Sequence, residues 1–500
     1  MKRPYGPLRA PRPLPPEGKS PPTAISGSAR PTWVAPARPF YAEATTRLRR
    51  RPRESGVGNV PEPLPPGADN STARGIPPGS EANLEIGSRS RPPSGAGNLA
   101  EKPRPSGRWF SKAERDRQLA PPKPVAPSQI AANIISRVDR QHPADKAIRD
   151  ELRRAVGMPP DNAAWISRAV FNYYRWRGWL EGRAGEKSAD LVSSVLDATV
   201  LAERFVQKAQ TFSAEELVAR VGPEWLPREL EVNVDLARAW QREPLLWLRC
   251  PPGRTAEVMA GLKDCAPGPV PDSLRYAASL DLFSTDLFHD GAFEIQDIAS
   301  QAVAHLAAPQ AGETWWDACA GEGGKTLHLG ALMQGKGLVW ASDRAEWRLK
   351  KLRVRAARAH CFNQRTVVWN DPLRPPTRTK FDGVLVDAPC AGLGTWGRNP
   401  HARWTTTPQD VAELSALQTQ LLTTAALAVK PGGKLVYAAC TLTRSETSDV
   451  AAAFTTAHRD FEPVLLTNPF VPQAAAEAPL FLWPQVTDGN GMFVAAWRRR

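Results

Sequence analysis

Two of the six cysteines stand where apolar runs end, a position from which a side chain can do chemistry. Cys390 closes the run FDGVLVDAPC, and Cys440 closes the run GKLVYAAC 50 positions later. A free cysteine is most often a buried core residue. It becomes a nucleophile where its surroundings lower its pKa and stabilise the thiolate. The residues around each cysteine therefore decide between these two interpretations.

Carboxylates follow the apolar runs in the same way. Asp317, Asp343 and Asp371 end the runs TWWD, GLVWASD and RTVVWND, and Asp387 precedes Cys390. An acid at the end of a second strand, about twenty residues past a glycine turn, can accept hydrogen bonds from ribose hydroxyls. Asp343 has this position, and Asp371 can reach an adenine amino group. Each could instead be a helix N-cap, but three in order favour an adenosyl-binding cleft.

The glycine turn itself is the segment DACAGEGGKT, from Asp317 to Thr326. It is not a nucleotide-triphosphate P-loop, because Cys319 stands where that motif requires a glycine, and the dinucleotide pattern GxGxxG is incomplete. What remains is a turn that brings backbone N–H groups and a helix N-terminus close to a polar or anionic ligand. A plain strand-to-helix turn is the alternative.

The elements that must position these residues alternate between strand and helix from residue 290 to 500, which predicts a doubly wound, mostly parallel α/β sheet. Seven strands are predicted, at TWWDACA, GLVWASD, RTVVWND, FDGVLVDAP, GKLVYAAC, PLFLWP and GMFVAAW. Helices are predicted at GKTLHLGALMQ, AEWRLKKLRVRAARAH, TPQDVAELSALQTQLLTTAALAV and SETSDVAAAFTTA. Ligands of such sheets bind beyond the carboxyl ends of the strands.

Two smaller regions precede this sheet. Residues 130–220 are predicted to be helical, with Ser213 as an N-cap and with an apolar stripe at three-to-four spacing: Trp165, Ile166, Ala169, Val170, Tyr173 and Trp176. The aromatic and arginine side chains here could bind RNA, although core packing is the commoner cause. Residues 221–285, with a short strand in EPLLWLRCPPGR and a helix in TAEVMAGLKDC, predict a small α/β connector.

Charge is concentrated at the N-terminus. Residues 1–130 hold 22 Lys and Arg against 10 Asp and Glu, and 26 of the 50 prolines. Such a segment buries too little apolar surface to fold, so a disordered basic tail is predicted. It could bind polyanions by counterion release or simply increase solubility. The helix predicted at Arg344–His360 is also basic, which indicates either a phosphate-binding surface or a solvated face.

Other compositional signals exclude several classes of protein. The start of the chain lacks the apolar core of a signal peptide, and no run of about 18 apolar residues predicts a membrane span. The cysteines show neither the paired spacing of zinc sites nor the density of a disulfide scaffold. We therefore expect a cytoplasmic protein without a bound metal. Cys250, Cys319 and Cys361 are interpreted as structural.

The motifs taken together resemble those of the RNA cytosine-5 methyltransferases of the RsmB/Nop/Sun family. The resemblance rests on DACAGEGGKT, DAPCAGLGTWGRNPHARW and GGKLVYAACTL, and on the flanking segments GAFEIQDIASQAVAHL and GMFVAAWRRR. It implies three regions: a NusB-like RNA-binding helical domain over 128–220, a connector over 221–285, and a Rossmann-like methyltransferase domain that depends on S-adenosylmethionine over 286–500. The disordered tail over 1–127 is predicted from composition alone and has no counterpart in the resemblance.

The resemblance also implies the chemistry of both cysteines. Carbon 5 of cytosine becomes nucleophilic only after a thiolate adds at carbon 6, which is covalent catalysis. Cys440 matches the family's nucleophile, Cys390 the cysteine that assists product release, and Asp387 the acid that holds the cytosine edge. The strands that end at the two cysteines should then be neighbours, about 4.8 Å apart. Lys325 is carried over as a polar active-site residue.

The implied binding site for S-adenosylmethionine combines the glycine turn with the acids at the strand ends. Its members are Asp317, Ala318, Cys319, Ala320, Gly321, Glu322, Gly323, Gly324, Lys325, Asp343, Arg348, Asp371 and Asp387. The sequence departs from the family pattern at Gly321-Glu322, at Ala439, at Gly397-Arg398 and in SETSD, without deleting a reacting group.

Three alternatives stay open at this stage. The substrate is expected to be ribosomal RNA, with transfer RNA as the second choice. Separately, the protein is expected to be a monomer. A non-catalytic RNA-binding or ribosome-assembly factor with the same fold is the rival function. The two thiols could also exchange roles, with Cys390 as the nucleophile.

Overall fold

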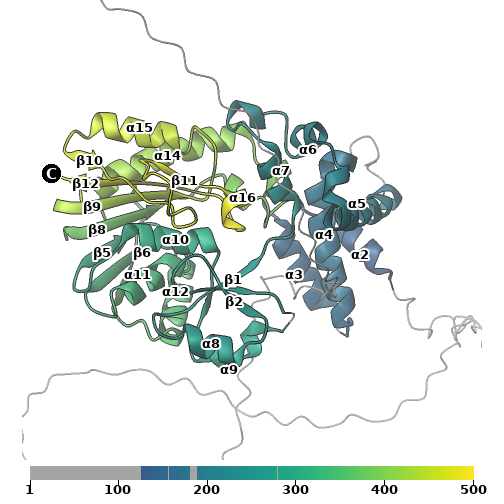
Figure 1. Cartoon of the computed structure of the whole chain (residues 1–500), viewed down its shortest axis with the longest axis horizontal. Helices are drawn as coiled ribbons and strands as arrows, with labels where there is room; N and C mark the ends of the chain where they lie inside the picture. The colour runs from purple at the N-terminus through teal and green to yellow at the C-terminus, as the bar shows by residue number, and fades with distance from the viewer. Residues whose placement is uncertain (1–124, 156, 181–187, 279) are drawn as a thin grey trace, which may run out of the picture. The chain divides into compact units, whose positions relative to one another are not determined.

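The structure is a computed structural model that describes residues 125–155, 157–180, 188–278 and 280–500 (Figure 1). The predicted disordered tail lies outside the described residues as far as Pro124. Among the described helices, none combines the length and the apolar composition that a membrane span requires.

The C-terminal region is built on one sheet whose strands follow the order β10-β12-β9-β8-β5-β6-β7, with β11 paired to β12. The pairs β9–β8, β8–β5, β5–β6 and β6–β7 are parallel, and β12 is antiparallel to its neighbours. The strands are β5 (Thr314–Asp317), β6 (Leu338–Asp343), β7 (Gln364–Val368), β8 (Phe381–Asp387), β9 (Val429–Ala439), β10 (Phe461–Pro463), β11 (Leu480–Leu482) and β12 (Met492–Arg499).

The sheet has eight strands, so the predicted number of seven is wrong by one. The missed strand is β10, which is three residues long and ends in proline. It pairs with Trp497–Arg499, whereas β11 pairs with Met492–Val494 on β12. Its short apolar signal is confined to Phe461, which is why the sequence does not predict it.

Helices cover both faces of this sheet (Figure 1). One face packs against α14 (Pro408–Ala426) and α15 (Ser448–Ala457), and the other against α10 (Ile298–Ala307) and α11 (Gly324–Leu332). Neighbouring residues such as Trp315 and Trp316 enter opposite layers because side chains alternate along a strand. The helix α12 (Glu346–Arg358) contacts β6 and β7.

The preceding region contains five helices among the described residues: α2 (Pro127–Ile135), α3 (Ala144–Arg154), α4 (Pro160–Leu180), α5 (Ser188–Lys208) and α6 (Ala214–Arg220). The predicted stripe is buried from Ile166 to Trp176. Ser213 is the N-cap of α6, as predicted, and its hydroxyl accepts a hydrogen bond of 3.1 Å from the Glu216 N–H. The aromatic side chains therefore pack as a core.

A second, four-stranded sheet lies between these regions in the chain, with the order β2-β3-β1-β4. Its strands are β1 (Leu246–Arg249), β2 (Cys265–Pro267), β3 (Ser273–Tyr276) and β4 (Glu294–Ile295). The remaining helices are short: η1 (Ala209–Thr211), η2 (Leu226–Arg228), α7 (Val234–Gln241), α8 (Thr255–Gly261), η3 (Leu282–Ser284), α9 (Asp286–His289), η4 (Leu393–Thr395), α13 (Ala402–Thr405) and α16 (Pro484–Thr487).

Candidate active site

The two cysteines meet at the carboxyl edge of the large sheet. The strands β8 and β9 are adjacent and parallel, as predicted, and Asp387 is paired with Ala438. Cys390 and Cys440 follow these two strand ends, and their sulfur atoms lie 3.2 Å apart. Both cysteines are reduced and partly exposed. The sheet topology therefore brings two distant thiols into contact at a surface that a ligand can reach.

The two thiols differ in their electrostatic surroundings. The hydrogen bond with Cys390 is the main cause of a lowered pKa for Cys440, and the Lys325 ammonium lowers it further, while burial and the Asp387 and Glu446 carboxylates oppose the shift. The same hydrogen bond, together with burial, raises the pKa of Cys390 well above its ordinary value. Either sulfur could donate in this contact, and the two pKa directions favour Cys390 as the S–H donor and Cys440 as the thiol that ionises first.

Lys325 and Asp387 form an ion pair beside the thiols. The Lys325 Nζ lies 2.8 Å from Asp387 Oδ2, and only about 8% of the lysine is exposed. Burial alone lowers a lysine pKa, but the contact with Asp387 outweighs it, so that the pKa of Lys325 is raised. The lysine stays charged, and it places a positive charge near the Cys440 sulfur.

The glycine turn and Asp343 form one hydrogen-bonded unit. Gly321 and Gly323 have φ angles of +55° and +90°, which glycine adopts without strain. The Gly321 N–H donates to Asp343 Oδ2 at 3.0 Å, and the Ala345 N–H donates to Asp343 Oδ1 at 2.8 Å. Arg348 Nη1 lies 3.8 Å from the same carboxylate. A side chain at Gly321 would meet no atom within 4 Å, so open space adjoins the turn.

Asp317, at the end of β5, has an unsatisfied oxygen. Its Oδ2 accepts a hydrogen bond of 2.6 Å from the Thr326 hydroxyl, but its buried Oδ1 has no partner. Complete burial raises the pKa of Asp317 to about 7. A buried polar atom without a partner is costly unless a ligand satisfies it. The orphan oxygen and the open glycine turn therefore fit a polar ligand such as the predicted methyl donor.

Other residues predicted for the donor site have neighbours within the protein. Ala318 and Ala320 are buried, and burial raises the pKa of Cys319 well above its ordinary value. The Glu322 carboxylate lies 3.1 Å from Lys351 Nζ. Asp371 is exposed, and its carboxylate accepts a hydrogen bond of 2.9 Å from the Leu373 N–H. Its reach to an adenine therefore stays a prediction, as does the role of Gly324.

Three of the six basic residues of α12, namely Arg348, Lys350 and Arg353, are exposed, and the other three form ion pairs with residues of other segments. Arg355 and Arg358 both pair with Glu294 of β4, and Lys351 pairs with Glu322. The sequence indicated either a phosphate surface or a solvated face. Lys351, Arg355 and Arg358 are instead held in ion pairs within the protein.

Sequence reasoning missed the buried carboxylate of Glu446, which lies in the segment SETSD. It has no exposed surface, and it accepts hydrogen bonds from Ala391 N–H, Thr441 and Thr443 hydroxyls, and the Gln418 amide. The only available signal was an acid six positions after Cys440. Nothing in the sequence showed that it also contacts the Cys390 loop.

The loop that starts at Cys390 packs on the helical region. Arg403 is completely buried, and its guanidinium donates to Gln241 Oε1 at 2.9 Å and to the carbonyl oxygens of Val221, Trp240 and Trp396. The Trp404 indole N–H donates to the Tyr174 carbonyl at 2.7 Å. The helical region thus fixes the far end of a loop whose near end carries a thiol.

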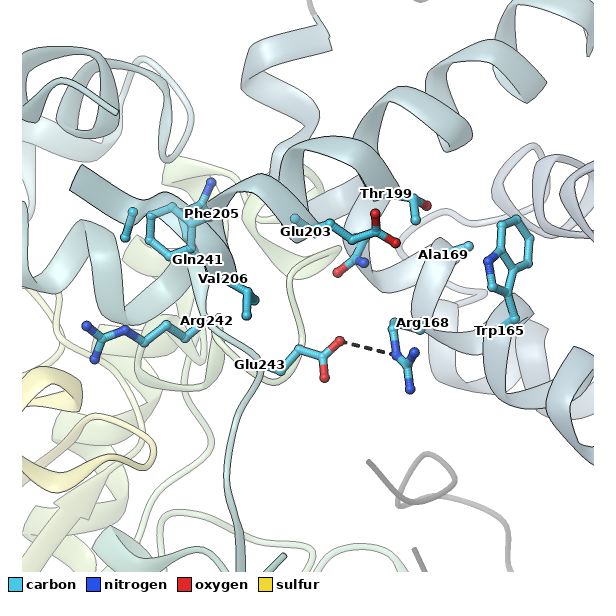
Figure 2. A pocket seen from close by; sticks show the side chains of 13 residues that line it. Trp165, Arg168, Ala169, Thr199, Glu203, Phe205, Val206, Gln241, Arg242 and Glu243 are labelled. Carbon is cyan, nitrogen blue, oxygen red and sulfur yellow. Dashed lines mark ion pairs between the residues drawn. The ribbon is translucent and has the colours of Figure 1, made fainter. Parts of the chain in front are cut away.

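A cavity of about 540 Å³ lies in the helical region (Figure 2), and its lining residues are far in sequence from both thiols. Residues of α4, α5, η1, the end of α7 and the segment after it line the cavity. The Arg168 Nε lies 3.5 Å from Glu243 Oε1. Trp165 is one of its lining residues, and none of the predicted site residues lines it.

Within the described residues, no group of three or more His, Cys, Asp or Glu side chains is arranged to hold a metal ion.

Comparison with known proteins places this site in a family. Residues 304–498 match the family model described as 16S rRNA methyltransferase RsmB/F. The chain is 34% identical over 296 residues to the "Probable ribosomal RNA small subunit methyltransferase B" of Synechocystis, covering 55% of this chain and 66% of that protein. It is 34% identical to the Bacillus subtilis protein of the same name, over 43% of this chain and 50% of that one.

A eukaryotic relative and a solved structure extend the comparison. The mouse "tRNA (cytosine(72)-C(5))-methyltransferase NSUN6" is 37% identical over 199 residues, covering 37% of this chain and 40% of that protein. The crystal structure of PH0851 has a TM-score of 0.62 and 23% identity, covering 75% of this chain and 99% of that chain. The chain thus spans between about 40% and 66% of the length of these curated relatives, and the solved structure shares its fold.

The sheet, the glycine turn and the strand-end acids define a protein of the Rossmann-like methyltransferase class. Within that class, residues 304–498 match the RsmB/F methyltransferase family.

Proposed function

We propose that this protein methylates carbon 5 of a cytosine in RNA, with S-adenosylmethionine as the methyl donor and Cys440 as the nucleophile. The observation that carries this proposal is the contact between the Cys390 and Cys440 sulfur atoms, with the Lys325–Asp387 ion pair beside them. The relatives named as ribosomal RNA and tRNA cytosine methyltransferases support the reaction class.

Four side chains have separate roles in the proposed reaction. The Cys440 thiolate adds to carbon 6, a sulfur–carbon bond forms, and the electron pair of the ring double bond moves to make carbon 5 nucleophilic. Asp387 holds the N3 edge, and Lys325 meets the negative charge that builds there. After methylation, the carbon-5 proton passes to solvent water, the double bond between carbons 5 and 6 re-forms, and Cys440 is expelled as a thiolate that accepts the Cys390 S–H hydrogen bond again.

The methyl donor would be held by residues at the ends of β5 and β6. Asp317 offers its unpartnered oxygen, the Gly321 turn offers open space, and Asp343 and Arg348 lie beside it. When bound, S-adenosylmethionine supplies an electrophilic methyl group. In this proposal the methyl donor lies at the ends of β5 and β6, and the cytosine lies at the ends of β8 and β9, on the same edge of the sheet.

The cytosine must be unpaired or flipped out, because a stacked base hides carbon 6 from a thiol. We infer that the substrate is ribosomal RNA, since the two bacterial relatives carry that name, with transfer RNA as the second candidate. Because both thiols must stay reduced, we expect the protein to act in a reducing compartment such as the cytoplasm. We also expect it to act as a monomer.

Mapping 5-methylcytosine in RNA from cells with and without the protein tests the proposal. We expect at least one site to disappear from small-subunit ribosomal RNA when the protein is removed, and to return with the wild-type gene but not with Cys440→Ala. Loss of a site only in transfer RNA would change the substrate but keep the reaction. An unchanged methylation map in all RNA would favour the non-catalytic RNA-binding factor.

A further inference from the structure

One buried carboxylate joins the two cysteine loops. Glu446 Oε1 accepts a hydrogen bond of 2.7 Å from the N–H of Ala391, the residue after Cys390. Its Oε2 accepts one of 3.0 Å from the hydroxyl of Thr441, the residue after Cys440, and one of 2.7 Å from Thr443. The same side chain therefore contacts the residue that follows each thiol.

Gln418 of α14 extends this contact to the other side of Cys390. Its Nε2 donates to the Pro389 carbonyl at 2.8 Å and to Glu446 Oε1 at 3.1 Å, and its Oε1 accepts the Tyr437 hydroxyl at 3.0 Å. Gln418, Tyr437 and Glu446 have no exposed surface. The peptide groups before and after Cys390 are thus both fixed by one buried polar cluster.

A buried carboxylate is a costly way to fill space, because it loses its hydration and needs several donors in return. Burial raises the pKa of Glu446, and the hydrogen bonds from Thr443, Ala391, Thr441 and Gln418 oppose this shift. An apolar residue of similar size would carry no such cost, but it could not connect two loops that meet only in the folded protein. The geometry points to a function in positioning.

We propose that Glu446 is a positioning residue, whose carboxylate holds the Cys390 and Cys440 loops so that the two sulfur atoms stay in hydrogen-bond contact. The inference rests on the proposed function, because the contact matters only if a thiol reacts. Glu446 acts through the backbone of its neighbours, and no direct contact with either sulfur atom is needed.

Alkylation of Cys440 by iodoacetamide in the full-length protein without RNA tests this role. Peptide mass spectrometry gives the rate at Cys440 as a function of pH. The groups that set its pKa are the Cys390 thiol, Lys325, Asp387 and Glu446. Glu446→Ala should disturb the Cys390 hydrogen bond, which is the main lowering cause, and it also removes the Glu446 charge, which is the smallest of the causes named for Cys440 and raises its pKa. The net effect should be a raised pKa of Cys440. We expect alkylation near neutral pH to slow about tenfold, since one pKa unit changes the thiolate fraction by that factor.

Glu446→Gln should behave differently, because its amide oxygen can still accept from Ala391 while its negative charge is lost. That charge raises the pKa of both thiols, so alkylation of this variant should be as fast as in the wild type or faster. Glu413→Gln is the matched control, since Glu413 is an exposed glutamate on α14 whose carboxylate accepts a hydrogen bond from Gln409. A merely structural residue would not separate the alanine and glutamine variants in this way.

The inference is overturned if Glu446→Ala unfolds cooperatively like the wild type and its Cys440 is alkylated at the wild-type rate. If Glu446→Ala does not fold, the same criterion applies to Gln418→Leu, which removes the contacts with Pro389 and Glu446. Adduct formation with RNA that contains 5-azacytosine is measured in parallel. A wild-type protein without any adduct refutes the proposed function, whereas the alkylation rates still decide the role of Glu446.

Discussion

The sulfur atoms of Cys390 and Cys440 lie 3.2 Å apart, although 50 residues separate them along the chain. Their contact follows from the parallel pairing of β8 and β9, which brings both strand ends to one edge of the sheet. It also makes the thiols unequal, because one sulfur donates a hydrogen to the other. The asymmetry favours Cys440 as the nucleophile and Cys390 as the protonated partner.

Replacing Lys325 with methionine should slow adduct formation near neutral pH by about tenfold, because a loss of one pKa unit of stabilisation leaves about a tenth of the thiolate. The lysine charge lowers the pKa of Cys440, so without it the pH profile should shift to higher pH and the rate should recover in alkaline buffer. The rate of adduct formation is measured as a function of pH.

Lys430→Met is the control for this experiment, because it removes an ion pair with Asp382 at the opposite end of β9. Its pH profile should match that of the wild type. If the Lys325 variant also keeps the wild-type profile, the ammonium does not influence the nucleophile.

Asp317 predicts a specific dependence of stability on pH. Its pKa is about 7 in the folded protein, against 3.8 for an ordinary aspartate. A raised pKa means that the folded state favours the protonated form. Its stabilising contribution is therefore complete below about pH 4 and is lost as the pH rises through about 7. Asp317→Asn removes this titration.

The measurement is the difference in melting temperature between Asp317→Asn and the wild type, followed from about pH 5 to about pH 8. The variant should gain relative to the wild type as the pH rises. A difference that stays constant over this range would show that Asp317 titrates at its ordinary pKa.

Gly394 lets three loops of the site approach closely. Its N–H donates to the Cys440 carbonyl at 3.1 Å, and its own carbonyl accepts from the Gly491 N–H at 2.8 Å. A Cβ at this position would lie 2.0 Å from the Gly491 oxygen and 3.0 Å from the Cys440 oxygen. Gly394→Ala should therefore lower the free energy of unfolding by about 1–3 kcal/mol or more, as overpacked sites do.

Denaturant unfolding compares this variant with Gly397→Ala in the same loop, where the added Cβ would have only an ordinary contact with Trp240. The control should be close to the wild type. Equal stability of the two variants would contradict the packing argument.

The parts of the fold that sequence predicts are those with a local signal. The strands that end at Asp317, Asp343 and Asp387 are continuous apolar runs followed by polar residues, so their positions and the strand-end location of the site were accessible. β10 was missed because three residues that end in proline carry almost no pattern.

The contacts that depend on the folded chain were not accessible from sequence. Arginine usually lies at the surface, yet Arg403 is buried against Gln241 and the carbonyl oxygens of three residues. Glutamate is also mostly exposed in proteins, yet the Glu446 carboxylate is buried and accepts hydrogen bonds from residues 55 and 28 positions before it. Such polar clusters form between segments far apart in the chain, and no periodicity records them.

The most direct test of the account is to trap the covalent intermediate. The wild-type protein, Cys440→Ala and Cys390→Ala are incubated with S-adenosylmethionine and with small-subunit ribosomal RNA transcribed with 5-azacytosine, and denaturing gels show the protein–RNA adduct. We predict an adduct with the wild type, none with Cys440→Ala, and an adduct with Cys390→Ala, which should also release product slowly from ordinary RNA. An adduct that persists in Cys440→Ala and disappears only in Cys390→Ala would contradict the assignment of the nucleophile.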